Sequence, residues 1–132
     1  MEIKRNEATI NRPEGDRVLD APVVFIDIPA FVEQLKNEKA WEKNDRNAIT
    51  VFKSETVTIV VSALQAAAQL NDNNVDEFVT IQVLEGNIRV TTQEGDIDMK
   101  EKNIVTFHPG IEHSIHSITD AIVLITTHHK EG

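Results

Sequence analysis

The sequence predicts one mainly β domain that carries a single helix near its N-terminus. The length of 132 residues suits one domain with one hydrophobic core. One segment of the chain has the apolar spacing of a helix, and short segments rich in β-branched residues, separated by turn residues, follow it. Many short strands after one helix are typical of an antiparallel sandwich or barrel.

The first part of the chain differs in composition from the rest. The first sixteen positions are mostly charged or polar, whereas the apolar residues gather between Arg17 and Thr127. A segment with few apolar side chains buries too little surface to hold one conformation. We therefore expect residues 1–17 to form a flexible arm and residues 18–132 to form the domain.

An apolar segment, VLDAPVVFIDI at residues 18–28, predicts the first strand of the domain. Pro29 follows it, and proline is tolerated in the first turn of a helix because its missing N–H would have no partner there. Phe31, Val32 and Leu35 then share one helix face. The pattern predicts a helix over about 29–42 that lies against the outside of a sheet.

Runs of β-branched and aromatic residues predict the remaining strands. These runs are AITVFK (48–53), TVTIVVSAL (56–64), FVTIQVLE (78–85), NIRVTT (87–92), DIDM (96–99), NIVTF (103–107), HSIHSI (113–118) and AIVLITT (121–127). Turn residues separate several of them, at Gly86, at Gly95 and at Pro109-Gly110. Short strands joined by such turns favour an antiparallel arrangement.

Charge and composition exclude several classes of partner and site. The formal net charge of −9 repels a phosphate backbone, so we expect no nucleic-acid partner. The absence of cysteine excludes disulfides, thiolate nucleophiles and zinc–thiolate sites. The longest apolar runs are far shorter than a bilayer span, and the opening MEIKRNEATINR lacks the apolar stretch of a signal peptide. We expect a soluble cytoplasmic protein with no membrane partner.

Two stretches of the sequence are similar to a known family. LQAAAQLNDNNVDEFVTIQVLEG (64–86), followed by NIRV, resembles the first conserved segment of the cupin superfamily, and IVTFHPGIEHSI (104–115) resembles the second. With the strands around them, the likeness covers roughly residues 47–127. The resemblance implies a cupin-type double-stranded β-helix, a jelly-roll barrel, with one N-terminal helix, and it implies a homodimer.

The family's motif positions carry few of its usual residues in this chain. In the first segment they fall, as the resemblance aligns them, on Ala67, Asn73, Val75, Val79 and Gly86. In the second segment they fall on Lys102, His108, Gly110, His113 and Ser117. Of the family's residues, the closing glycine of the first segment and the turn glycine and ligand histidine of the second remain. The resemblance therefore implies a barrel whose metal site is reduced to His113 and one weak oxygen.

The remaining side chains suit a metal poorly. A catalytic metal needs about three imidazole or carboxylate ligands, and Val75 and Val79 have no donor atom, while Asn73 offers a neutral amide oxygen. We therefore predict no metal and no other cofactor. The alternative is a rebuilt site in which His113, His108 and an acidic residue of the loop 71–77 bind iron, zinc, nickel or manganese, as in an oxygenase or isomerase.

The predicted site is a binding pocket for a small, partly apolar molecule inside the barrel. Alternate strand residues share a face, so Val79, Ile81 and Val83 are expected to form apolar walls, with Val75 near the rim. The full set of predicted ligand-binding residues is His113, Asn73, Val75, Val79, Ile81, Val83 and His108. A third hypothesis is a structural or interaction module that docks through its arm, and the sequence leaves open whether the protein is an enzyme.

Two further histidines end the last predicted strand. His128 and His129 are adjacent, so they point to opposite faces and cannot bind one ion together. We interpret them as a solvated terminus.

Overall fold

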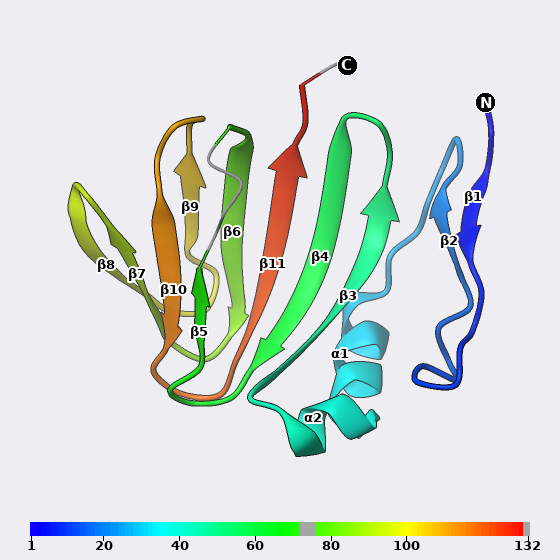
Figure 1. Ribbon diagram of the computed structural model, residues 1–132, viewed down its shortest axis with the longest axis horizontal. Helices are drawn as coiled ribbons and strands as arrows, with labels where there is room; N and C mark the ends of the chain where they lie inside the picture. The colour runs from blue at the N-terminus through cyan, green and yellow to red at the C-terminus, as the bar shows by residue number, and fades with distance from the viewer. Residues whose placement is uncertain (72–75, 131–132) are drawn as a thin grey trace.

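The structure, a computed structural model, describes residues 1–71 and 76–130 (Figure 1). Its elements are β1 (Lys4–Asn6), β2 (Arg17–Asp20), α1 (Ile28–Asn37), α2 (Lys39–Lys43), β3 (Arg46–Lys53), β4 (Val57–Leu64), β5 (Gln69–Asn71), β6 (Phe78–Glu85), β7 (Ile88–Thr92), β8 (Gly95–Met99), β9 (Ile104–Phe107), β10 (His113–Ser117) and β11 (Ala121–His128). The predicted mainly β fold is confirmed.

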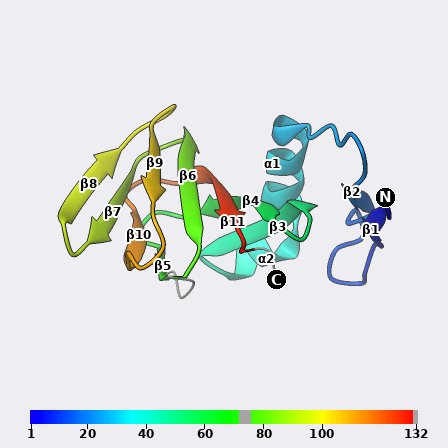
Figure 2. The ribbon, with the colours of Figure 1, turned by 90° about the horizontal axis from the view of Figure 1, so that it is seen from above.

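Two antiparallel sheets form the body of the molecule. One has the strand order β3-β4-β11-β6-β9, and the other has the order β5-β10-β7-β8. Seen from above, the strands of both sheets curve around one interior, while the helices lie on the opposite side of β3 and β4 (Figure 2). Neighbouring strands are far apart in the sequence, β4 beside β11 for example, as in a jelly roll.

The inner strands of the five-stranded sheet carry apolar side chains on both faces. Along β11, Ile122 packs with the cluster beneath the helices, whereas Val123 packs with the cluster inside the barrel. Alternation along a strand explains this division. The barrel cluster consists of Leu64, Ala68, Val79, Ile81, Val83, Ile88, Val90, Met99, Phe107, Ile115, Ala121 and Val123. Burial on both faces explains why β11 reads as a continuous apolar run rather than an alternating one.

The tight turn between β6 and β7 requires glycine. Gly86 has φ +81°, and a Cβ at this position would lie 2.2 Å from the carbonyl oxygen of Asp120. Any other residue would collide with the backbone that leads into β11. The closing glycine of the resembling segment is therefore kept for a structural reason.

The predicted helix over 29–42 is two helices that meet at Glu38. The Asp27 side chain accepts a hydrogen bond from the backbone N–H of Ala30 at 3.3 Å and caps α1. Glu38 has extended backbone angles, φ −81° and ψ 150°, so the chain turns there before α2. Leu35 of α1 is fully buried against the outer face of the sheet, which confirms the predicted position of the helix.

The predicted strand over 18–28 is wrong beyond its first residues. β2 ends at Asp20, and Val23 and Phe25 are 86% and 88% exposed. Pro22 has no backbone N–H to donate to a neighbouring strand, so it disfavours an extension of the β2 pairing. Val23 and Phe25 therefore cover no core, whereas Ile26 is partly buried against the cluster beneath the helices.

Residues 1–17, predicted as a flexible arm, make defined contacts with the body of the protein. β1 pairs with β2 in a separate two-stranded ribbon. The guanidinium groups of Arg12 and Arg17 donate to the carbonyl oxygens of Ala48 and Thr50, at 2.8 and 2.7 Å. These carbonyls belong to β3, the edge strand of the large sheet, so the arm covers part of that edge. The mobility of the arm in solution stays a prediction.

Candidate functional site

The strand register places the predicted apolar residues on the inner face of the barrel. Val79 of β6 lies opposite Thr127 of β11 and opposite Phe107 of β9. Val79, Ile81 and Val83 share this face and are 2%, 1% and 0% exposed. A space wide enough for water beside them would raise these fractions. Ile81 and Val83 are therefore packed core residues, and a pocket wall formed by them requires the core to open.

One row of side chains crosses the inner face at the end where β11 stops and β6 starts, the upper end in Figure 1. Residues directly opposite each other on neighbouring antiparallel strands have Cβ atoms about 5 Å apart. Reading across β4, β11, β6 and β9, this upper row consists of Thr58, Thr127, Val79 and Phe107. The upper row thus combines two hydroxyl groups with two apolar side chains.

His113 adds an imidazole to the upper row. Its ring is stacked on Phe107, with centroids 4.0 Å apart and planes inclined by 4°, and the residue is 7% exposed. The Nδ1 atom lies 3.2 Å from the carbonyl oxygen of Ile111. A carbonyl only accepts, so this contact assigns the hydrogen to Nδ1. His113 starts β10 of the small sheet, so the stacking joins the two sheets at the upper end.

His108 lies on the other side of the large sheet from His113. It is exposed, and its ring contacts the edge of Phe78 at a centroid distance of 5.3 Å. Phe78 precedes Val79 in β6, so its side chain points outward. The structure therefore does not bring together the two histidines of the alternative metal site.

Two other predicted site residues, Asn73 and Val75, lie outside the described residues. Within residues 1–71 and 76–130, no three histidine, aspartate or glutamate side chains are grouped closely enough to hold a metal ion.

Three polar side chains joined by hydrogen bonds lie at the upper end of the barrel, and the sequence pattern did not predict their contact. His129 follows β11, and its Nδ1 contacts the carboxylate of Glu77, while its Nε2 lies 2.6 Å from Oγ1 of Thr58. The backbone N–H of His129 also donates to the carbonyl oxygen of Thr56 at 2.8 Å. Because β11 lies between β4 and β6, it brings the three side chains together from distant parts of the chain. We call Glu77, His129 and Thr58 the polar relay.

The interpretation of the last two histidines as a solvated terminus holds for one of them. His128 is exposed and lies edge-on to Phe78 on the outer face. His129 has a side chain only 30% exposed and is held by Glu77, whose side chain is 20% exposed. The sequence indicated that His128 and His129 point to opposite faces, because they are adjacent on a strand. The partners of His129 depend on the order of the strands, which this local pattern does not show.

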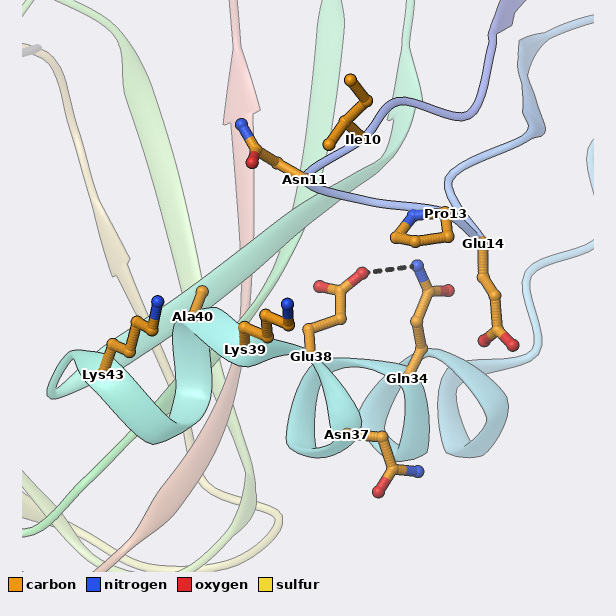
Figure 3. Close-up of a pocket in the computed structure, with 10 residues that line it drawn as sticks. All are labelled: Ile10, Asn11, Pro13, Glu14, Gln34, Asn37, Glu38, Lys39, Ala40 and Lys43. Carbon is orange, nitrogen blue, oxygen red and sulfur yellow. Dashed lines mark hydrogen bonds between the residues drawn. The ribbon is translucent and has the colours of Figure 1, made fainter.

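A groove on the other side of the molecule lies between the N-terminal segment and the helices (Figure 3). It has a volume of about 600 Å³, and its lining residues are Ile10, Asn11, Pro13, Glu14, Gln34, Asn37, Glu38, Lys39, Ala40 and Lys43. Glu38 lies within it and accepts hydrogen bonds from Gln34, Asn47 and Arg12. Burial raises the pKa of this carboxyl, but these hydrogen bonds and the Arg12 charge outweigh burial and hold the pKa below its usual value.

The sequence matches no protein-family model and no curated protein. Solved structures do match. A cupin superfamily protein from Desulfitobacterium hafniense is 15% identical with a TM-score of 0.63, covering 66% of this chain and 80% of that one. An RmlC-like cupin protein from Desulfovibrio desulfuricans is 23% identical with a TM-score of 0.57, covering 63% and 81%.

A third similar structure carries a named activity. It is a sugar phosphate isomerase of the cupin superfamily from Silicibacter pomeroyi, 15% identical with a TM-score of 0.58, and the match covers 65% of this chain and 60% of that one. Among the described residues, no helix has the length and apolar character needed to cross a membrane. At these identities the likeness concerns the fold, and it agrees with the two resembling segments of the sequence: the chain has the fold of the cupin superfamily.

Proposed function

We propose that the protein binds a small, partly apolar molecule at the upper end of the barrel, without a conventional metal centre. One observation carries the proposal: the buried imidazole of His113 is stacked on Phe107 at the end of a largely aliphatic inner face. A buried polar group among apolar side chains is the arrangement that fixes the orientation of a ligand in a binding site.

The upper row offers both kinds of contact that such a molecule needs. Val79 and Phe107 are apolar but only 2% and 5% exposed, so a ligand contacts them only where the upper end of the barrel opens, whereas Thr58 and Thr127 are partly exposed and carry hydroxyl groups that donate or accept. Below Val79 on β6, Ile81 and Val83 are fully buried. The ligand is therefore expected to sit across the upper row, with its polar group toward His113, and not to enter the lower core.

Binding is tested with a panel of small aromatic alcohols, carboxylic acids and sugars, followed by calorimetry for the compounds that raise the melting temperature. We expect the His113→Ala variant to bind at least about fivefold more weakly, since one buried hydrogen bond contributes on the order of 1 kcal/mol or more. The matched control is His108→Ala, which removes an exposed imidazole from the outer face. Equal affinity in both variants, or no binding by any compound, contradicts the proposal.

Elemental analysis of protein purified without chelator separates this proposal from a metal-dependent oxygenase or isomerase. We expect no stoichiometric iron, zinc, nickel or manganese. One metal ion per chain that is lost in the His113→Ala variant would favour the enzyme over the proposed binding protein. The proposal further places the protein in the cytoplasm as a homodimer, and light scattering of the full chain measures the assembly.

A further inference from the structure

We propose that the polar relay makes Thr58 a nucleophile for small esters, so that the upper end of the barrel carries an acyl-transfer or esterase activity. The observation is the chain of contacts from the Glu77 carboxylate through the His129 imidazole to the Thr58 hydroxyl. A carboxylate, an imidazole and a hydroxyl in this order are the parts of an activated nucleophile, whatever the fold that holds them. This inference does not depend on the proposed role of His113.

The hydrogen-bond directions in the relay follow from its end groups. An ionised carboxylate only accepts, so Nδ1 of His129 carries the hydrogen that Glu77 receives. The neutral imidazole then has a lone pair on Nε2, which accepts the Thr58 O–H at 2.6 Å. This tautomer is the one in which His129 takes the proton of Thr58 when Oγ1 forms a bond.

The backbone around the relay is fixed. Thr58 pairs with Lys53 on one side and Thr127 on the other, in the middle of three hydrogen-bonded strands. The backbone N–H of His129 is bonded to Thr56, two residues before Thr58. The distance between imidazole and hydroxyl is therefore set by the sheet, and a nucleophile held in place reacts faster than a mobile one.

The surroundings of Thr58 define the class of substrate. Its side chain and that of His129 are partly exposed, so an ester can reach Oγ1. Thr127, next in the upper row, is partly exposed, whereas Val79 beyond it is buried and apolar, so the space beside Thr58 is short. The relay would thus accept a neutral ester of a short acyl chain. The net charge of −9 disfavours anionic esters.

The reaction balances without a further reactant other than water. The Thr58 O–H proton moves to Nε2 of His129 as Oγ1 bonds to the carbonyl carbon of the ester. The bond from that carbon to the alcohol oxygen then breaks, and His129 gives its proton to the departing alcohol. Water repeats the two steps on the acyl-threonine, which releases the carboxylic acid and restores Thr58.

The full chain is tested with p-nitrophenyl acetate. We expect release of p-nitrophenolate together with an acetyl group on Thr58, located by peptide mass spectrometry after an acid quench. In Thr58→Val and His129→Gln the release should fall at least about tenfold, because the nucleophile or its base is gone. Thr58→Ser keeps the hydroxyl and should retain activity. Thr126→Val is the matched control, since it removes a hydroxyl from the outer face of β11.

Glu77 is a positioning residue that acts through His129, and separate measurements of kcat and KM test this role. Glu77→Gln is expected to lower kcat with little change in KM, because the ester does not contact it, and Glu77→Asp should recover part of kcat. A purely structural role would change the melting temperature in both variants alike.

Two results would overturn the proposal: release that is equal in wild type and Thr58→Val, or a wild-type protein with neither an acetyl group on Thr58 nor release above the buffer rate. The second result concerns the wild-type protein alone, so it overturns the proposal even if a variant fails to fold. Unchanged ligand binding in His113→Ala with intact acetylation of Thr58 would count against the proposed function alone.

Discussion

The inner face of the large sheet differs sharply between two neighbouring rows of side chains. The upper row contains Thr58, Thr127, Val79 and Phe107. The row one step below, across the same four strands, contains Val60, Ile125, Ile81 and Val105. The lower row is entirely aliphatic, whereas the upper row has two hydroxyl groups and borders His113 and His129. Ile81, Val105 and Ile125 of the lower row pack with the barrel core, and the upper row carries the groups on which the two proposals rest.

The largest expected effect comes from a charge placed in each row. Ile81→Glu buries a carboxylate among aliphatic side chains and should cost about 3 kcal/mol or more. Val79→Glu should cost less, because the Thr127 hydroxyl opposite it can donate a hydrogen bond. Urea denaturation measures both. The control is Thr106→Glu, on the exposed outer face of β9. Equal losses at positions 79 and 81 would show that the upper row is as apolar as the lower one.

A truncation in the lower row comes next in size. Ile81→Ala removes packed methyl groups and should lower the free energy of unfolding by about 2–5 kcal/mol. Ile104→Ala, at a side chain that is 59% exposed, should change it by no more than about 0.5 kcal/mol. Chemical denaturation of the pair gives the difference. A small loss for Ile81→Ala would mean that the lower core is loose enough to admit a ligand.

Truncation of His113 should lower the stability more than truncation of His108. His113→Ala removes a stacked, buried ring and should lower the free energy of unfolding by about 1–3 kcal/mol. His108→Ala removes an exposed ring and should change the stability by less than about 0.5 kcal/mol. The melting temperatures of the two variants provide the comparison. Equal values would contradict the assignment of His113 to the inner face.

The smallest effect concerns the polar cluster around Glu38, outside the barrel. Its pKa is lower in the folded protein than usual, so the ionised form stabilises the fold above the unfolded-state pKa, and this contribution is lost as pH falls through the folded-state pKa. Glu38→Gln should reduce stability at neutral pH and make the loss of stability on acidification shallower. Melting temperatures from neutral to acidic pH measure this. Parallel curves for the variant and wild type would show that Glu38 does not contribute.

Much of the fold could be predicted from the sequence, because its strands and turns are local patterns. The run FVTIQVLE matches β6 residue for residue, and Gly86 stands where the turn demands positive φ. The predicted strand 18–28 was wrong beyond Asp20, where Pro22 disfavours further pairing, and the single helix was wrong because a tertiary contact fixes the turn at Glu38. Glu38 is bonded to Arg12, 26 residues away, and no periodicity shows that contact.

The candidate site was less predictable than the fold. Parity along β6 placed Val79 and Ile81 on one face, but it does not tell which of them lies next to polar groups. That depends on register with β11 and β9, which sets Thr127 and Phe107 beside Val79. The contact of His129 with Thr58 spans 71 residues and likewise depends on strand order.

The most direct test of the contrast between the rows is a methyl NMR titration of protein labelled at isoleucine, valine and threonine methyl groups, with a compound from the binding panel as probe. We expect the methyl signals of Val79 and Thr127 to shift with the ligand, while those of Ile81 and Val83 stay in place. Shifts at Ile81 and Val83, or shifts confined to the groove around Ile10, would contradict the assignment of binding to the upper row.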